Sequence, residues 1–584
     1  MTQTVRCYRS SPRCSFRSAS TTRPHPEGFT PRRPTPLGSA LSRLTTIGKP
    51  RRPREKRCVA EHLTMKMAIF TIRKRDRMLN GVGMEQAAVL VVGAGPSGLV
   101  LAVGLAAHGV AVRVVDTMSG PAVTSRANIL HARGVEVLQR LGAMGDLRER
   151  SLAPVGMRMY ARSRPLATMR FAPDDCESVQ ALFVSQAHIE EQLRGRLTEL
   201  GVDIEWGRTV TAASQDADGV TVEFADGTRL RTDWLVGCDG ARSVVRGAAG
   251  IGFPGVPVVE QFLLADVNAE WDRDRSTSAG FYHRSGLLLA IPMRANDSGD
   301  RWRLMADIPA ADRHLSAAEI VTRFEQLLPE RAGETGVRIR EAVWTSVFRI
   351  HRRLAANYRS GRLLLAGDAA HIHSPIGGQG MNTGIGDAEN LAWKLALVVG
   401  GRADAKLLDT YTAERRPLAA DVLRTTTNNT KILVGDGILA RFVRDRVFIP
   451  LLDSPKVQQK ATRTASQLWV TYRKGPLGSR RGPAPRPGDR VPDRECTRRE
   501  GGSTALSVEL QPNWVLLARP GTTIAALESV AGEHLGPHVT VLTDSAAPHH
   551  ASLIRPDGHL AWRGNDSEAL HKWFTDTLYS RIRT

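Results

Sequence analysis

The sequence predicts an α/β protein that is built around a doubly wound parallel sheet and interrupted by an antiparallel sheet. An apolar run at 87–92 leads through a glycine-rich turn and a helical stretch to a second apolar run at 110–115. Two later apolar segments, 234–236 and 363–365, each end close to an aspartate beside a glycine. Buried parallel strands have this apolar character. The region 259–347 instead alternates apolar and polar residues between turn signals, which favours antiparallel strands.

The first segment reads as strand, turn, helix, strand and acid over residues 87–116. Gly93 is expected to make the turn, Gly95 to let the backbone approach a pyrophosphate, and Gly98 to let the helix pack on the strand. Asp116 ends the second strand, where a carboxylate accepts from a ribose hydroxyl. NAD and FAD both carry adenosine diphosphate, so this unit leaves the choice between them open. Two further candidate cofactor contacts in the loop are Pro96 and Ser97.

A second motif, DWLVGCDGARSVVR, spans residues 233–246 and places Asp239 directly after a strand. Asp239 is suited to cap the short helix that follows. Arg242 and Arg246 are suited to face phosphate. Taken alone, the motif favours a capped helix with surface arginines over a cofactor contact.

The most informative stretch runs from Gly367 to Leu395, where a strand leads into Asp368, a Pro/Gly-rich turn and a long helix. Asp368 is placed to accept from a polyol such as ribitol. The turn glycines lack a Cβ, so a flat ring fits against the backbone. The dipole and free N–H groups of the helix start favour negative charge on a flavin ring. The expected contacts in this stretch are Gly367, Asp368, Gly377, Gly378, Gly380, Met381 and Asn382.

Neither the histidines nor the cysteines predict a metal site. His371 and His373 form a His-x-His pair, but no further ligand cluster lies near them in sequence, so contacts beside the flavin are favoured. The cysteines contain no CxxC pair, which favours a reducing compartment without a disulfide frame. They are Cys7, Cys14, Cys58, Cys176, Cys238 and Cys496.

The net charge of +21 is concentrated at the N-terminus, where residues 1–83 carry 19 Lys and Arg against four Asp and Glu. The rest of the chain is only mildly basic and does not indicate a nucleic-acid partner. No apolar run approaches the roughly 20 residues of a membrane span. We therefore expect a cytoplasmic protein without a membrane partner.

Residues 1–83 are rich in Arg, Ser, Thr and Pro and are predicted to form a disordered basic extension. We favour an over-extended start with the true one at Met84, because the first strand begins a few residues later. A transit peptide is an alternative, although repeated prolines oppose its amphipathic helix. A disordered tail that belongs to the protein is the third possibility.

The expected domains follow from these patterns. Within the sheet region, 286–293 is predicted to be a strand that faces the flavin. Tyr282, His283 and Arg284 are candidates to reach a phenol, but solvent-exposed turn positions are the favoured interpretation. We expect the flavin domain at 85–160, 182–258 and 350–400, the sheet domain at 161–181 and 259–349, a helical segment at 401–473, a Pro/Gly/Arg linker at 474–489 and a final domain at 490–584.

The three motifs, in this order and spacing, resemble the FAD-dependent aromatic hydroxylases of the para-hydroxybenzoate hydroxylase type. Within that family the chain looks most like aromatic polyketide hydroxylases and rifampicin-type monooxygenases. SRANILHARGVEVL at 125–138, SQAHIEEQL at 185–193, LLDTYTAERRP at 407–417 and RPDGHLAWRG at 555–564 support the resemblance, which covers about residues 86–570.

The resemblance implies roles for individual residues. Arg126 and Gln186 would reach the pyrophosphate and ribitol, and Val210 would touch adenine. Asp239 belongs to a motif that the family links to both FAD and NAD(P)H. Asp116 stands where many relatives have Glu, with little expected change. Pro375 and the segment 377–382 would line the isoalloxazine, and the candidate substrate contacts are Tyr282, Pro375 and Ile376.

The resemblance also implies a C-terminal thioredoxin-like domain without a redox pair, since Cys496 is the single cysteine there. Packing, with a possible homodimer contact, is its expected role. The implied reaction uses tightly bound FAD, transient NAD(P)H (NADPH favoured) and O2 to hydroxylate a phenolic or polyketide-like ring through a flavin C4a-hydroperoxide. A flavin-dependent epoxidase or halogenase, or a non-catalytic flavin protein that sequesters a ligand, is the alternative. The proton-transfer residue and the substrate are not identified by the sequence.

Overall fold

The structure is a computed structural model of the 584-residue chain. It describes residues 87–122, 127–152, 156–161, 164–169, 180–294, 300–309, 315–373, 378–434, 442–510 and 512–579. The chain divides into two units, 1–81 and 82–584, and every described residue belongs to the second. The expectations for the N-terminal 83 residues therefore lie outside the described residues, and so do those for Arg126, Pro375, Ile376 and Gly377.

The first sheet confirms the predicted doubly wound parallel core. Its strands follow the order β14-β15-β8-β1-β2-β5, and all neighbours from β15 to β5 are parallel. β1 is apolar along its length because both faces of the sheet are covered. The strands are β1 Ala87–Val92, β2 Val112–Asp116, β5 Ile204–Trp206, β8 Arg229–Gly237, β14 Arg359–Ser360 and β15 Leu363–Leu365, with the hairpin β6 Val210–Gln215 and β7 Val220–Phe224 paired to β8.

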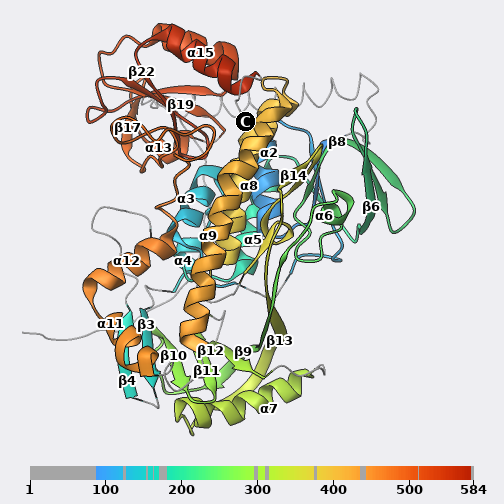
Figure 1. Cartoon of the computed structure of the whole chain (residues 1–584), viewed down its shortest axis with the longest axis vertical. Helices are drawn as coiled ribbons and strands as arrows, with labels where there is room; N and C mark the ends of the chain where they lie inside the picture. Colours follow the sequence, from blue (N-terminus) through green and yellow to red (C-terminus); the bar gives the residue numbers. More distant parts are fainter. Residues whose placement is uncertain are drawn as a thin grey trace, which may run out of the picture. The chain divides into compact units, whose positions relative to one another are not determined.

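Helices from distant parts of the sequence cover this sheet. α2 packs directly on both α5 and α8, and α3 packs on α8 (Figure 1). The long helix α8 is buried along almost its whole length, which explains why its sequence carries so many small and apolar residues. The helices are α2 Pro96–Ala107, α3 Ala132–Leu141, α4 Leu147–Arg150, α5 Gln186–Glu199, α6 Val244–Ala248 and α8 Gln379–Val399.

The second sheet follows the order β16-β13-β9-β12-β11-β10-β3-β4. It is antiparallel as predicted except for one parallel pair, β3 with β10. β3 belongs to this sheet although its residues were expected in the flavin domain at 85–160. It precedes β10 by more than a hundred residues, and a connection of that length permits parallel pairing. The strands are β3 Gly156–Ala161, β4 Arg164–Met169, β9 Gly255–Glu270, β10 Thr277–His283, β11 Gly286–Pro292, β12 Arg301–Ile308, β13 Arg338–Leu354 and β16 His371–Ile372.

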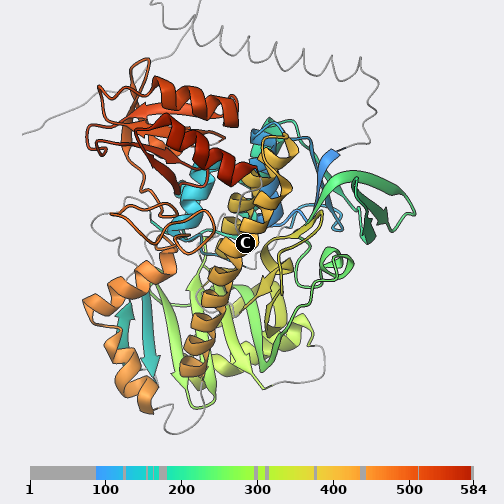
Figure 2. The same ribbon diagram turned by 45° about the horizontal axis from the view of Figure 1, so that its top comes forward.

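The long strands β9 and β13 run past the boundaries expected at 259 and 349. β13 ends by pairing Leu354 with His371 of β16, so the second sheet reaches the segment that contains Asp368. Alternating hydrophobicity marks where strands occur, but it does not mark where a strand passes from one domain to the next. The helix α7 Ala317–Leu327 covers one face of the sheet (Figure 2). Its Ile320 and Phe324 are buried against the strands, and the short π-helix η1 Leu328–Ala332 follows it directly.

The predicted helical segment contains η3 Ala405–Leu408, α9 Asp409–Val434, η4 Arg444–Phe448, α11 Ile449–Leu451 and α12 Pro455–Ser466. The segment 474–489 has no helix or strand, as a linker should, but its end is held in place. The backbone N–H of Tyr472 donates to Gly488 at 2.7 Å, and Gly488 donates to Leu560 of the final domain at 2.7 Å. No described helix combines the length and the hydropathy that crossing a membrane requires.

The final domain has one mixed sheet of order β18-β17-β20-β19-β21-β22, in which only β19 and β20 are parallel. Cys496 is buried in the apolar layer on one face, and burial raises the pKa of its thiol to about 11, which suits a packing role. The elements are β17 Glu495–Arg498, β18 Ser503–Ala505, α13 Leu506–Glu509, β19 Trp514–Ala518, α14 Ala525–Leu535, β20 Val539–Thr543, β21 Ala551–Ile554, β22 Leu560–Gly564 and α15 Ser567–Leu578.

Candidate active site

The three sequence motifs meet at one edge of the first sheet. They follow β1, β8 and β15, which are adjacent parallel strands, so their carboxyl ends lie side by side. Backbone hydrogen bonds join the loops: Cys238 donates to Val92 at 2.8 Å, and Ala366 donates to Gly237 at 3.0 Å. In doubly wound sheets this edge is where ligands bind.

The glycines of the first loop have the properties that their predicted roles require. Gly93 has φ +104°, which favours glycine, and a Cβ on Gly98 would collide with the Gly93 carbonyl. Gly95 is not required by packing within the protein, because a Cβ there would meet no described atom within 4 Å. The first turn of α2 has Pro96 and no side-chain cap, so its N–H groups are available to an anion.

Asp116 lies at the end of β2, beside the same loop. Its carboxylate accepts hydrogen bonds from the N–H of Ala94 at 2.7 Å and of Met118 at 2.8 Å. The acid therefore organises the glycine loop itself. A carboxylate oxygen accepts more than one hydrogen bond, so this arrangement is compatible with a ribose contact.

The second motif adopts the capping geometry that the sequence favoured. Asp239 accepts from the N–H groups of Val244 at 2.8 Å and Val245 at 3.2 Å. Its other oxygen, Oδ1, is buried without a hydrogen-bond partner among the described residues. Arg246, expected near phosphate, instead donates to the carbonyl of Ala369 at 2.9 Å and so supports the turn that carries Asp368.

The third motif presents an exposed acid before an uncapped helix. Asp368 lies in the short 3-10 turn Gly367–Ala369, and no described residue forms a hydrogen bond with its carboxylate. α8 begins after Gly378, which has φ +63° and provides no side-chain cap. The free N–H groups of a helix start belong to its cap and first three residues, here ending at Met381.

Asn382 has a different part in the site from the predicted one. It follows those free N–H groups, and its side chain is buried. The carboxamide accepts from the N–H of His131 at 2.8 Å and donates to Ile129 and Gly378, each at 3.0 Å. Asn382 thus fastens the segment before α3 to the start of α8. Its position gave no signal for this, because the two segments are about 250 residues apart.

A buried ionic group lies directly under the Asp368 turn, and the sequence did not predict it. Asp387 of α8 accepts from Arg415 Nε at 2.7 Å and from the Gly367 N–H at 3.3 Å. It also pairs with His371 Nε2 at 2.7 Å, which gives this histidine a polar partner as expected. Burial raises the pKa of Asp387, but attraction to Arg415 and His371 outweighs it and keeps the pKa below the usual value.

The remaining predicted site residues lie in different surroundings. Gln186 begins α5 and accepts from the N–H of Ala127 at 3.2 Å, which links it to the segment before α3. Val210 is buried at the start of β6. Tyr282 is buried in β10, so the solvent-exposed interpretation is wrong for it, whereas Arg284 is exposed in the turn. Tyr282 lies one residue before the end of β10, and burial raises the pKa of its phenol.

The predicted strand at 286–293 forms β11, and a cavity of about 160 Å³ lies beyond its end. The cavity joins Met293 and Arg301 of the second sheet to Ser185, next to Gln186. Asp266 lines it and is held by Arg303 through two hydrogen bonds of 2.7 and 2.8 Å. The cavity therefore lies between the second sheet and the start of α5, and both polar and apolar residues line it.

A second buried charge network joins α8 to the final domain. Glu414 accepts from Lys394 Nζ at 2.8 Å and from Arg555 at 2.9 and 3.1 Å, and all three side chains are at most 1% exposed. Burial raises the pKa of Glu414, but Arg555 and Lys394 lower it to about 2. Arg555 also pairs with Asp557, and Asp557 accepts from Trp393 at 3.2 Å. The segment AENLAWKL therefore meets RPDGH in the interior through Trp393, which donates to Asp557, and through Glu414, which Lys394 and Arg555 share.

Comparison with known proteins shows the family to which the chain belongs. The FAD binding domain family matches residues 86–426, which is more than half of the chain. The chain belongs to the FAD-dependent aromatic-ring hydroxylases. The C-terminal domain of aromatic-ring hydroxylases matches residues 484–578 of this hydroxylase.

Individual relatives match this chain over nearly their full length. A rifampicin monooxygenase from Streptomyces venezuelae is 36% identical over 488 residues, 82% of this chain and 96% of the relative. The anhydrotetracycline hydroxylase OxyS from Streptomyces rimosus has a TM-score of 0.70 at 32% identity, covering 85% of this chain and all of OxyS. Aklavinone-11 hydroxylase, solved with FAD and aklavinone, has a TM-score of 0.69 at 26% identity, covering 84% and 99%. The predicted family is confirmed, and the hydroxylase is an FAD-dependent monooxygenase.

The residues of this hydroxylase fit FAD. Gly95 offers open backbone, Asp368 offers a carboxylate without a described partner, and Asp239 Oδ1 is buried without one. The helices α2 and α8 both begin without side-chain caps. Pyrophosphate, ribitol and an electron-rich ring edge are the chemical groups that such donors and acceptors bind.

Proposed function

We propose that the protein uses NAD(P)H and O2 to hydroxylate an electron-rich aromatic small molecule, phenolic or polyketide-like. The observation that supports this best is the convergence of three motif loops at adjacent carboxyl ends of the parallel sheet, next to a second sheet with its own cavity. The relatives named above act on rifampicin, anhydrotetracycline and aklavinone according to their names. Bound FAD would supply the redox chemistry that activates O2.

The chain's own residues would bind and orient this cofactor. Gly93, Gly95 and Gly98 shape the loop for the pyrophosphate, and Asp116 accepts from the adenosine ribose. Asp368 accepts from the ribityl chain. The start of α8 stabilises negative charge on the flavin ring through its dipole and its free N–H groups. The second sheet, joined to this region through β16, would cover the ring and exclude water.

The proposal is tested on purified full-length protein. We expect bound FAD, NAD(P)H oxidation that depends on an aromatic substrate from a panel of simple and polycyclic phenols, and a product heavier by one oxygen atom. A product with an added halogen would instead indicate a halogenase. Tight binding of a panel compound without turnover would indicate a sequestering protein. Either result would overturn the proposed hydroxylation.

Gly95→Ala is expected to weaken FAD binding at least about tenfold without destabilising the apoprotein. The backbone at Gly95 has φ −77° and ψ −178°, which alanine adopts easily, and its Cβ would meet no protein atom within 4 Å. The methyl group would instead occupy the space assigned to the pyrophosphate. FAD affinity is measured by titration of the apoprotein, and stability is measured by its thermal midpoint.

Gly336→Ala is the matched control, because its Cβ also meets nothing within 4 Å and it lies in the exposed bend before β13, at the opposite end of that strand from its pairing with β16. It should leave the FAD affinity unchanged. Equal FAD affinity in Gly95→Ala and the wild type would refute the role assigned to this loop.

A further inference from the structure

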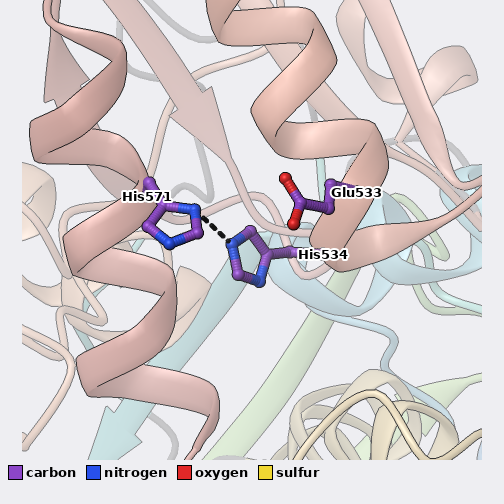
Figure 3. A group of neighbouring side chains, drawn as sticks. All are labelled: Glu533, His534 and His571. Carbon is purple, nitrogen blue, oxygen red and sulfur yellow. Dashed lines mark hydrogen bonds between the residues drawn. The ribbon is translucent and has the colours of Figure 1, made fainter.

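Three metal-ligating side chains meet on the helical layer of the final domain, far along the chain from the flavin motifs. Glu533 and His534 lie in the last turn of α14, and His571 lies in α15. Figure 3 shows the two imidazoles facing each other, with the Glu533 carboxylate beside His534. His534 Nε2 and His571 Nδ1 are 3.1 Å apart, and one ligand atom from each of the three residues lies within 4.8 Å of the others.

The surroundings hold one ligand in place and leave the other two open to water. His534 is 6% exposed, and its ring stacks on Phe574 of α15 with the centroids 4.8 Å apart. Glu533 and His571 are exposed. Water therefore has access to complete a coordination sphere, while the buried imidazole needs little reorganisation.

We propose that Glu533, His534 and His571 form a binding site for a divalent transition-metal ion of the zinc class. Two nitrogens bound to tetrahedral zinc are separated by about 3.3 Å, given Zn–N distances of about 2.0–2.1 Å. The observed 3.1 Å separation of the facing nitrogens is close to this value. The exposed Glu533 carboxylate reaches the ion by a change of side-chain rotamer, and water supplies the fourth ligand.

Metal binding replaces the hydrogen bond between the two histidines. That bond needs a proton on one of the facing nitrogens, whereas coordination needs a lone pair on both. The proton moves to the other nitrogen of the same ring, so each neutral imidazole stays neutral. The ion would then connect α14 to α15, whose residues Leu527 and Phe574 share an apolar cluster with Trp393 of α8. The site is structural and does not depend on the proposed hydroxylation.

The test uses tag-free, full-length protein with FAD bound, treated with EDTA and titrated with ZnCl2 by calorimetry. Wild type should bind one equivalent, and Co²⁺ in its place should give the visible absorption of a tetrahedral site. His571→Gln should weaken Zn²⁺ binding at least about tenfold, since it removes one of two nitrogen ligands. Glu533→Gln should weaken it less. Zn²⁺ should raise the thermal midpoint of the wild type but not that of His571→Gln.

His549→Gln is the matched control, because His549 is an exposed histidine of the same domain that contacts Arg519 instead of this group. It should bind Zn²⁺ like the wild type. The thermal midpoint in EDTA shows that each variant is folded. The absence of a saturable single equivalent, or equal Zn²⁺ affinity in His571→Gln and the wild type, would overturn the proposal.

Discussion

Glu414→Gln is expected to lower the free energy of unfolding by about 3–5 kcal/mol, which is the usual cost of breaking a buried ion pair from one side. Glu414 is the shared partner of Lys394 and Arg555, and all three side chains are almost fully buried. A glutamine keeps the shape but leaves the buried Lys394 without its carboxylate and leaves Arg555 with Asp557 as its remaining counter-charge. The change is measured as the shift of the denaturant midpoint with the wild-type slope.

The surface variant Asp421→Asn is the control, because at least half of each side chain in its pair with Arg424 is exposed and the pair should contribute less than about 1 kcal/mol.

The pH dependence of the free energy of unfolding provides a second check. Because the pKa of Glu414 is lowered to about 2 from 4.5, its contribution is complete above pH 4.5 and is lost as the pH falls toward 2. The difference between variant and wild type should therefore shrink as the pH falls below 4.5 toward 2. A difference under about 1 kcal/mol at pH 7 would contradict the assigned role.

Asp387→Asn is expected to destabilise the fold by about 3 kcal/mol and to weaken FAD binding about tenfold. The Asp387 carboxylate forms hydrogen bonds with Arg415, His371 and the Gly367 N–H. Gly367 directly precedes Asp368. Without the carboxylate, Arg415 keeps its bonds to the Thr383 carbonyl and the Tyr472 hydroxyl, but the turn loses its anchor. The two effects are measured by denaturant unfolding and by FAD titration.

Asp409→Asn removes a carboxylate that is 64% exposed and pairs with Arg359, and it should change neither quantity appreciably. The FAD titration separates two roles for Asp387. Loss of stability with unchanged FAD affinity would mean that the buried group supports the core but does not position the Asp368 turn. Weakened affinity of the expected size would show that the turn depends on it.

Local patterns in the sequence were sufficient for the features that depend on neighbouring residues. The run from β1 through Gly93–Gly98 to β2 has the strand, turn and helix that its apolar periodicity predicts. The start of α8 after Gly378 and the cap formed by Asp239 are also local, since each involves residues within a few positions. The resemblance of the three motifs identified the family, which the comparisons confirm.

Pairings between distant segments were not predictable in the same way. Tyr282 lies next to a turn, but the apolar cluster that buries it comes from other strands and from Ile449. The parallel pairing of β3 with β10 depends on how the chain crosses between domains. The sequence suggested phosphate or solvent for Arg246, and only the position of Ala369 decided that Arg246 donates to a carbonyl.

The sequence by itself therefore determined the parallel sheet, the glycine loop, the acid after each motif strand and the family. These follow from residue type and short spacing, because turns and helix starts are formed by residues close together in the chain. Only the tertiary structure decided which buried charges pair. Glu414 finds Arg555 across 141 positions, and Asp387 finds Arg415 across 28. A buried charge must be matched by whichever cation the fold brings to it, and no local pattern encodes that choice.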